Sequence, residues 1–310
     1  MKELQKRFIP VMLTPFQTSG EVDYYGLTAL TEFYLGSGAR GLFANCLSSE
    51  MYALTPAERL EVVRHVVDVV PNEIPVVATG VFEGPVEEQA DFAKSMYDTG
   101  VQTVIITTNM MATADESDAV LADRVHRLLD LTDSIPVGFY ECPVPYKRVL
   151  SPALLQQFVA TGRVKYHKDT CLDINQIRDK LALVNGADFG LYDAYMGHAV
   201  ESLRAGAAGL SCIQGNYFPE LIVWLCDHYA TPSLQPKVHQ LQHLLIRHMD
   251  IMHHDYPVAA KYYLQQQGLP ISVTTREGSG KLTSETRQVM DNLCRECVTF
   301  REELGIEVVK

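Results

Sequence analysis

Lys168 ends a short strand-like segment, residues 163–168, and is the residue of this chain with the clearest chemical potential. Side chains alternate along a strand, which predicts that Val164 and Tyr166 share a face with Lys168 while His167 lies on the other face. Lysine is rarely buried unless it is paired or functional. Burial lowers a lysine pKa, and the neutral amine can then form a Schiff base with a carbonyl compound. An exposed lysine at the strand end is the alternative.

A tyrosine ends another apolar segment, residues 136–140. Alternation places Gly138 and Tyr140 on one face, and Gly138 leaves room beside the phenol. Neighbouring parallel strands lie about 4.8 Å apart, so a phenol on one strand can reach an amine on the next. Tyrosine is a known general acid or base. An interior tyrosine with a satisfied hydroxyl is the alternative.

Hydroxyl side chains follow the apolar segment 41–45, at Ser48 and Ser49. Consecutive hydroxyls and successive backbone N–H groups in a turn make an anion-binding concavity, and a carboxylate is the obvious small anion. A simple polar turn is the alternative. The segment 206–216 is rich in small residues and carries Ser211. It could lie beside a ligand, although its glycines favour close packing instead.

The amine, the phenol and the hydroxyl turn together describe Schiff-base chemistry on a 2-oxo acid. The amine condenses with the ketone, and the protonated imine then acts as an electron sink. The phenol moves protons, and the turn holds the substrate carboxylate. We therefore predict Lys168 and Tyr140 as catalytic residues, Ser48, Ser49 and Ser211 as substrate-binding residues, and no metal site.

Short apolar segments alternate with helix-like stretches over the first two thirds of the chain. Such alternation predicts a parallel sheet, and eight units over ~220 residues predict a closed (β/α)₈ barrel, with chemistry at the carboxyl ends of the strands. An open doubly wound sheet usually has a Gly-rich turn after its first strand, which residues 13–16 lack. The expected strands are residues 8–14, 41–45, 75–79, 103–107, 136–140, 163–168, 187–191 and 208–213.

Helix-start signals mark the intervening stretches. Thr55 and Glu58 have the spacing of a capping box, and Ser151 and Asp173 are further N-cap candidates. The strand–helix alternation stops after residue 216. We predict a barrel domain over residues 1–216 and a helical domain over 217–310, which serves packing or oligomer contacts. Its expected helices are residues 219–229, 236–252, 256–267 and 284–304.

The composition limits the class of protein. The 310 residues include 26 basic and 38 acidic side chains, a net charge of −12 that argues against nucleic acid or an anionic membrane as the main partner. No apolar run approaches the ~20 residues of a transmembrane helix. The charged start lacks a signal-peptide core, and seven scattered cysteines predict reduced thiols, so we expect a cytoplasmic protein.

Two motifs resemble metal-binding motifs but do not predict a metal site. Cys294 and Cys297 form a lone C-x-x-C within a predicted helix, and no second pair supplies the four ligands that zinc needs. His239 and His243 lie four residues apart, but no Glu follows the first histidine as in the metalloprotease motif. We interpret these histidines as a solvated helix face.

The chain resembles the dihydrodipicolinate synthase / N-acetylneuraminate lyase family of class I pyruvate-type aldolases. The similarity runs from Thr14-Pro15-Phe16 through the tail. The family's Gly-x-Tyr-x-x-Pro motif is matched by 138–143, and its Schiff-base lysine by Lys168. Its hydroxyl loop is matched loosely by 46–50, and its eighth-strand motif ending in Asn by 209–216. The resemblance implies a (β/α)₈ barrel with a C-terminal helical domain, usually a homotetramer, that needs no metal or organic cofactor.

Four positions depart from the family pattern. Leu47 stands where the relay hydroxyl usually lies, Met110 and Met111 stand where the synthase has a tyrosine pair, and Pro145 replaces an arginine that binds a dicarboxylate substrate. Methionine cannot shuttle protons, and proline cannot bind a carboxylate. We therefore expect an aldolase, retro-aldolase or dehydratase acting on pyruvate or a 2-oxo(-3-deoxy) acid. Residues 146–148 are candidates for further substrate contacts.

Two other functions stay open at this point. One is a non-catalytic relative that binds and senses a 2-oxo acid. The other is a metal-dependent barrel aldolase that uses Glu50, Asp169 or Asp193. In each case we expect a small-molecule partner, no nucleic acid or membrane partner, and a homo-oligomer, either a tetramer or a dimer.

Overall fold

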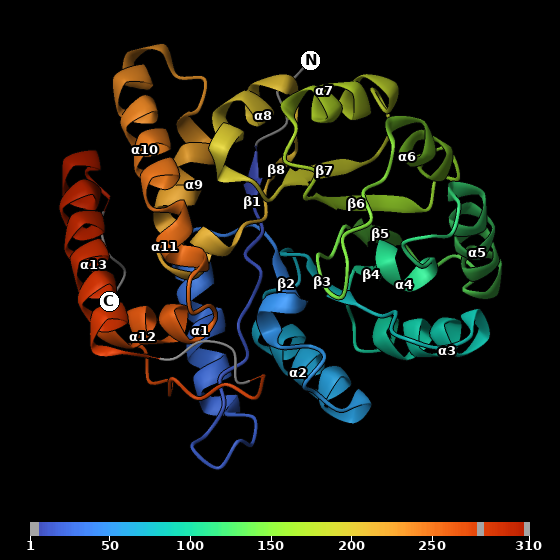
Figure 1. Cartoon of the computed structure of the whole chain (residues 1–310), viewed down its shortest axis with the longest axis horizontal. Helices are drawn as coiled ribbons and strands as arrows, with labels where there is room; N and C mark the ends of the chain where they lie inside the picture. Colours follow the sequence, from blue (N-terminus) through green and yellow to red (C-terminus); the bar gives the residue numbers. More distant parts are fainter. Residues whose placement is uncertain (1–5, 278–281, 307–310) are drawn as a thin grey trace.

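The computed structural model describes residues 6–277 and 282–306. Eight parallel strands form one sheet in the order β1-β8-β7-β6-β5-β4-β3-β2. A parallel bridge between Val11 and Phe43 joins the segment after β1 to β2, so the sheet closes on itself (Figure 1). The predicted (β/α)₈ barrel is confirmed. The strands are β1 (Arg7–Phe8), β2 (Leu42–Asn45), β3 (Val76–Thr79), β4 (Thr103–Thr107), β5 (Val137–Tyr140), β6 (Val164–Asp169), β7 (Gly190–Asp193) and β8 (Gly209–Leu210).

Helices cover the outside of the barrel, and three of them begin at the N-caps that the sequence predicts. The Thr55 hydroxyl accepts from the backbone N–H of Glu58 at 3.2 Å, and the Glu58 carboxylate accepts from the N–H of Thr55 at 2.9 Å. Ser151 and Asp173 also cap their helices. The helices are α1 (Tyr24–Gly36), α2 (Pro56–Val69), α3 (Val86–Tyr97), α4 (Thr108–Met111), α5 (Asp118–Leu131), α6 (Pro152–Val159), α7 (Ile174–Leu183) and α8 (Ala199–Ala205).

The barrel interior is a cluster of aromatic and aliphatic side chains that alternate inward from the strands. A side chain at Gly138 on β5 would collide with neighbouring side chains. A Cβ at that position would lie 2.7 Å from Ile105 Cδ1 and 2.8 Å from Tyr166 Cβ. The glycine therefore makes room for Ile105 and Tyr166, whereas the sequence predicts room beside the Tyr140 phenol.

A register shift interrupts the pairing of β5 with β6. Val137 pairs with Val164, but the next residue of β5, Gly138, pairs with Tyr166, so Lys165 is an extra residue. Val164 consequently packs outward with Val137, whereas Tyr166 faces the interior. The expectation that Val164 shares a face with Lys168 is therefore wrong, because a bulge reverses the alternation at this point.

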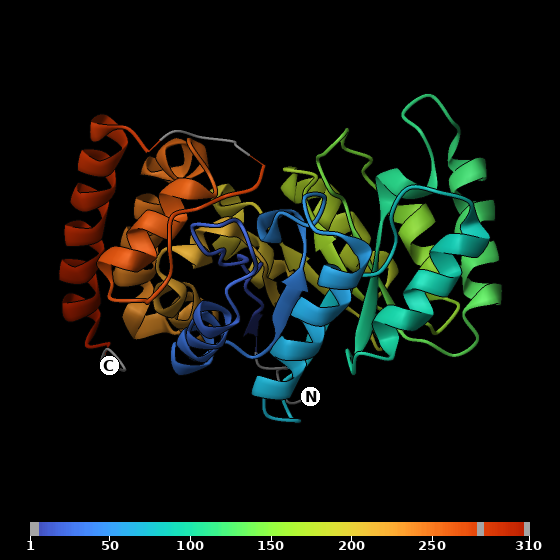
Figure 2. The same ribbon diagram turned by 90° about the horizontal axis from the view of Figure 1, so that it is seen from below.

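The C-terminal third of the chain is helical and lies at one side of the barrel (Figure 2). Of its helices, α9 packs against β1, and α10 and α11 pack against short 3₁₀ turns that follow β7 and β8. The predicted helix over 236–252 is divided at His248. The division of the chain into a barrel domain and a separate C-terminal helical domain remains a prediction. The helices are α9 (Pro219–His228), α10 (Gln235–Arg247), α11 (Met249–His253), α12 (Val258–Gln266) and α13 (Ser284–Leu304).

A buried carboxylate joins this helical part to the barrel. Glu50 ends the 3₁₀ turn η1 (Leu47–Ser49) in a left-handed conformation, with φ of 56°. The Lys261 ammonium of α12 donates to Glu50 Oε1 at 2.7 Å. The backbone N–H groups of Arg276 and Glu277 donate to Glu50 Oε2 at 2.6 and 3.1 Å. The hydroxyl turn and the C-terminal part are therefore held by one charged group.

Among the described residues, no helix combines the length and the apolar character needed to cross a bilayer. The seven cysteines all carry free thiols, as their odd and scattered distribution predicts.

Candidate active site

Lys168 lies at the carboxyl end of β6, directly beside Tyr140 of β5 in the strand register. Only 4% of the lysine is exposed. Its Nζ lies 4.2 Å from the centre of the Tyr140 ring and 6.0 Å from that of Phe43. Burial lowers the Lys168 pKa, and within the described ranges no carboxylate forms an ion pair with it. The position therefore favours the neutral, nucleophilic amine.

Tyr140 is also buried, with 3% of its surface exposed. Burial raises the pKa of its phenol well above the ordinary value of 10, and the Cys142 thiol acts in the same direction. The phenol is therefore protonated at neutral pH and can donate. Its ring covers the Lys168 amine on one side, and Phe43 meets that ring edge-on at 5.7 Å.

A cavity of about 600 Å³ opens above the amine. Its lining comes from the strand ends on one side and from the C-terminal part of the chain on the other. This volume is in the range of small-molecule sites. The polar residues that line it are Ser48, Tyr140, Lys147, Lys168, Thr170, Tyr195, Gln214, Asp250, His253, Tyr256 and Glu277.

Of the two serines predicted in the hydroxyl turn, only Ser48 lines the cavity. The Ser49 hydroxyl donates to the Met12 carbonyl at 2.7 Å and accepts from the Cys46 N–H at 3.1 Å. Ser49 thus fixes the turn, and its role in substrate binding stays a prediction. Residues at the start of a helical turn leave N–H groups without a partner inside that turn, which gives Leu47 and Ser48 donors for an anion.

Ser211 lies in the barrel interior beneath the cavity. Its hydroxyl accepts from the Tyr166 phenol at 3.0 Å and donates to the Ile9 carbonyl at 2.9 Å. The residue is fully buried and is not among those that line the cavity. Ser211 therefore supports the inner aromatic layer, and its binding role also stays a prediction.

The loop after β5 contributes one of its three candidate residues to the cavity, Lys147, whose ammonium donates to the Thr170 carbonyl at 2.9 Å. The Tyr146 hydroxyl donates to backbone carbonyls of the α4 region. Arg148 pairs with Asp118 at 2.9 Å. These two side chains stabilise the loop.

Gln214 and Tyr256 are among the cavity residues that the sequence analysis does not predict. Gln214 is 1% exposed, and its Oε1 has no hydrogen-bond partner among the described residues. Tyr256 precedes α12 and reaches the cavity from the C-terminal part. Gln214 lies in the small-residue segment 206–216, but no sequence pattern marks it as a cavity residue. Tyr256 could not be placed, because sequence patterns do not show which helical ends meet the barrel.

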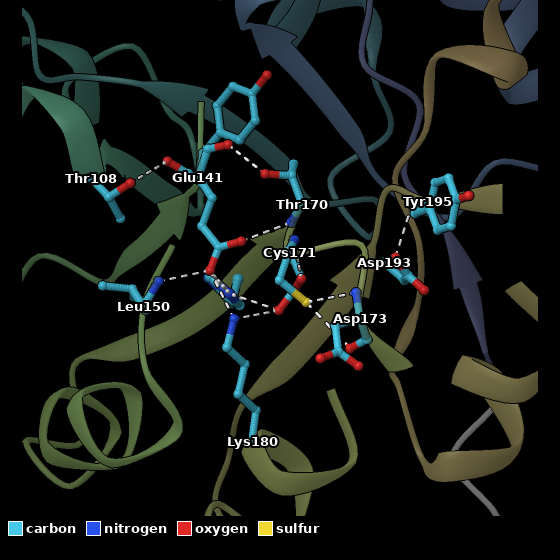
Figure 3. A network of polar contacts seen from close by, with 12 residues as sticks. Thr108, Glu141, Leu150, Thr170, Cys171, Asp173, Lys180, Asp193 and Tyr195 are labelled. Carbon is cyan, nitrogen blue, oxygen red and sulfur yellow. Dashed lines mark hydrogen bonds and ion pairs between the residues drawn. The ribbon is translucent and has the colours of Figure 1, made fainter. Parts of the chain in front are cut away.

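A buried polar network lies on the opposite face of the same strand ends (Figure 3). Glu141 and Asp169 directly follow Tyr140 and Lys168 in the sequence. The Lys180 ammonium of α7 donates to Glu141 Oε1 at 2.8 Å and to Asp169 Oδ2 at 2.6 Å. The backbone N–H of Thr170 donates to the other oxygen of Glu141 at 2.8 Å. The network fixes the strand ends that carry the amine and the phenol.

The charges in this network compensate one another. Burial opposes ionisation of Lys180, but Glu141 and Asp169 outweigh it and raise the Lys180 pKa. Burial likewise opposes the charge on Asp169, yet His167 and Lys180 lower the pKa of that carboxyl strongly. The His167 pKa is raised too, because Glu141 and Asp169 outweigh its desolvation.

Glu141, His167 and Asp169 have ligand atoms within 4.8 Å of one another, as a metal site requires. However, the Lys180 ammonium already contacts both carboxylates, so a cation of the protein stands where a metal would bind. Of the three carboxylates considered for a metal-dependent aldolase, only Asp169 belongs to this group among the described residues. Glu50 pairs with Lys261, and Asp193 lies 3.0 Å from His198.

The fold and the site define a (β/α)₈ barrel with a desolvated lysine beside a tyrosine at the carboxyl ends of adjacent strands. The model of the dihydrodipicolinate synthetase family matches residues 4–296. The chain belongs to this family.

Curated relatives share less than a quarter of their residues with the chain. It is 24% identical over 258 residues to 4-hydroxy-tetrahydrodipicolinate synthase of Pseudoalteromonas atlantica, which covers 83% of this chain and 86% of the relative. It is 23% identical to the enzyme of that name from Stutzerimonas stutzeri, which covers 83% of this chain and 87% of the relative.

Solved structures confirm the fold. A prophage protein of the dihydrodipicolinic acid synthase family from E. coli K12, in complex with pyruvate, has a TM-score of 0.84 and 22% identity, covering 95% of this chain and 99% of that one. The chloride-inhibited dihydrodipicolinate synthase from Acinetobacter baumannii, complexed with pyruvate, has a TM-score of 0.84 and 19% identity, with the same coverage.

Proposed function

We propose that the protein is a class I lyase that forms a Schiff base between Lys168 and pyruvate or a 2-oxo(-3-deoxy) acid. The observation that carries the proposal is the buried Lys168 amine, which has a lowered pKa, lies against Tyr140 and borders the cavity. Membership of the dihydrodipicolinate synthetase family supports it. Two solved relatives of the same fold hold pyruvate.

The site residues have distinct roles in this reaction. The Lys168 amine attacks the ketone carbon, and loss of water gives an iminium ion that accepts the electron pair released when the substrate is cleaved or dehydrated. The Tyr140 phenol transfers a proton to or from the reacting substrate. The backbone N–H groups of Leu47 and Ser48 bind the carboxylate.

The lining of the cavity favours a 2-oxo-3-deoxy acid over the synthase substrate. Leu47 lines the cavity and has no hydroxyl. Met111 is buried among apolar side chains, and Pro145 is exposed. None of these three side chains can relay a proton or bind a second carboxylate. The additional polar groups of the cavity, Lys147, Asp250 and His253, suit the hydroxyls of a longer substrate.

From the family resemblance we propose that the protein forms a homo-oligomer, either a tetramer or a dimer. We also propose that it lies in the cytoplasm. Neither a nucleic acid nor a membrane is part of the proposal, in keeping with the net charge of −12. Sedimentation velocity would measure the assembly, and a monomer at micromolar concentration would contradict it.

Borohydride trapping tests the proposal directly. Pyruvate and borohydride together should add the mass of reduced pyruvate to Lys168, and Lys168→Ala should abolish the adduct. Lys165→Ala is the matched control, because Lys165 lies on the same strand but pairs with Asp188 at 2.7 Å near the surface. Failure of the native protein to trap any 2-oxo acid would overturn the proposal.

A screen of 2-oxo-3-deoxy acids for pyruvate release would identify the reaction. Tyr140→Phe should lower kcat by about 10²–10⁴-fold, the range for loss of a general acid or base. Tight pyruvate binding without turnover of any acid would favour the non-catalytic alternative.

A further inference from the structure

A second phenol borders the cavity that contains Lys168 and Tyr140. Tyr256 lies between α11 and α12, so it reaches the site from the C-terminal part of the chain, whereas Tyr140 reaches it from the barrel wall. Burial raises the pKa of the Tyr256 phenol, which is therefore protonated at neutral pH. The proposed Schiff-base function has given this group no role.

Hydrogen bonds fix the direction in which Tyr256 can donate. The Asn216 amide nitrogen donates to the Tyr256 oxygen at 2.6 Å and to the Val11 carbonyl at 2.8 Å. The Asn216 carbonyl oxygen accepts from the Tyr34 phenol. Both amide protons are thus in use, and the amide cannot flip without losing these contacts. The Tyr256 oxygen must accept from Asn216, so its own proton is free to point elsewhere.

Tyr256 and the reacting amine border the same cavity and share some of their neighbours. Ser48, which lines the cavity, is a hydrogen-bond partner that lowers the Tyr256 pKa. The buried thiols of Cys46 and Cys212 act electrostatically on both the Tyr256 phenol and the Lys168 amine. The phenol and the amine therefore share one part of the cavity wall.

Schiff-base chemistry requires protons at two different places. Condensation places one on the oxygen that leaves as water, and cleavage or dehydration moves another at a more distant substrate atom. A single phenol cannot occupy both positions. Tyr195 also borders the cavity, but its ring packs edge-on against His198, and no described residue holds its oxygen.

We propose that Tyr256 is the acid that releases water when the Lys168 Schiff base forms, a role that rests on the proposed function. The amine adds to the ketone, and one N–H proton moves to the ketone oxygen to give a carbinolamine. Tyr256 then donates its proton to that hydroxyl as the C–O bond breaks. Water leaves, and the nitrogen lone pair forms the C=N bond of the iminium.

The phenolate left on Tyr256 is stabilised by donors already in place. Asn216 donates an N–H, and the Ser48 hydroxyl can donate as well. The new iminium cation on Lys168 adds an opposite charge nearby. Hydrolysis of the iminium reverses the step and returns the proton to Tyr256, so the cycle needs no other acid.

Rapid-quench borohydride trapping, with saturating pyruvate, tests this role. Tyr256→Phe should slow iminium formation by about 10²–10³-fold while the final yield of Lys168 adduct stays complete. Tyr217→Phe is the matched control. It removes another buried phenol of the same region, one that donates to the Met252 carbonyl at 2.8 Å and does not line the cavity. That variant should trap at the native rate.

Each outcome is decisive. Trapping by Tyr256→Phe at the native rate would overturn the role of Tyr256 and leave the proposed function intact, whereas no adduct in the native protein would overturn the proposed function itself. Should Tyr256→Phe fail to fold, Ser48→Ala removes a donor to the phenolate with less disturbance. At saturating pyruvate it should slow trapping about tenfold, an amount typical of one lost hydrogen bond, and an unchanged rate would contradict the proposal.

Discussion

Two buried lysines, Lys168 and Lys180, meet the carboxyl end of β6 from opposite faces of the barrel wall. Lys168 is 4% exposed and Lys180 is 0% exposed. Burial is the largest influence on both, yet the pKa of Lys168 is lowered and that of Lys180 is raised. The difference lies in the partners, since Lys180 contacts Glu141 and Asp169, whereas Lys168 contacts aromatic rings. The presence or absence of opposite charge therefore decides whether the pKa of each buried amine is raised or lowered.

Alternation along one strand produces this division. Tyr166 and Lys168 point into the barrel, while His167 and Asp169 point to α7. The outer face therefore anchors the segment through ion pairs, and the inner face is left free of counter-charge. Rigid support from the outer face suits a reactive group, because the supporting side chains do not touch the substrate.

The sharpest test of the comparison is to remove each amine in turn. Lys180→Met leaves Glu141 and Asp169 buried without their cation, which should cost about 3–5 kcal/mol of unfolding free energy. Lys168→Met should abolish pyruvate trapping without such a loss. Urea unfolding and trapping, measured on both variants, separate the two roles. Equal stability of Lys180→Met and the native protein would contradict the structural role of Lys180.

A smaller effect should follow when one outer carboxylate is neutralised. Glu141 accepts the N–H groups of Leu150 at 3.0 Å and Thr170 at 2.8 Å, besides the Lys180 ammonium. Glu141→Gln keeps the shape but presents an NH₂ donor to one of these N–H groups, which should cost about 1–3 kcal/mol. The pH dependence of trapping at Lys168 should stay unchanged, as measured by initial trapping rates. A shifted profile would show that the two faces are electrostatically coupled.

The smallest effect concerns stability and pH. Folding lowers the pKa of Lys168 below 10.5, so between the two values the unfolded chain binds the extra proton and stability rises with pH. Lys168→Met should therefore be more stable than the native protein by about 1 kcal/mol at pH 7, as is common when a functional strain is removed, and this advantage should shrink toward pH 10.5. Folding raises the pKa of Lys180, so its contribution is present below 10.5 and is lost above that pH. Urea unfolding between pH 7 and 10.5 measures the unfolding free energies of the native protein and of Lys168→Met. A difference between the two that does not change with pH would contradict the lowered pKa of Lys168.

Much of the fold follows from local sequence patterns. Each of the eight strands overlaps its predicted segment, and the Thr55 capping box forms as expected, because both depend on neighbouring residues. Lys168 and Tyr140 are adjacent as predicted, since the register of parallel neighbours follows from their strand ends. The bulge at Lys165 and the helix break at His248 were not predicted, because each depends on packing against distant segments.

The rest of the site depends on contacts between distant parts of the chain. Tyr256 acquires its position from Asn216, Lys180 acquires its partners from two strands, and neither pairing has a sequence spacing that would reveal it. Similarly, Ser48 and Ser49 look equivalent in sequence. Their hydroxyls differ because the Met12 carbonyl lies beside only one of them.

The Glu50 carboxylate makes the helical C-terminal part indispensable to the hydroxyl turn. Its partners are the Lys261 ammonium and the backbone of residues 276 and 277, all supplied from beyond residue 216. A barrel expressed without them would leave the buried Glu50 carboxylate without these three donors. The conformation of the turn at one end of the pocket is thus inherited from the last third of the polypeptide.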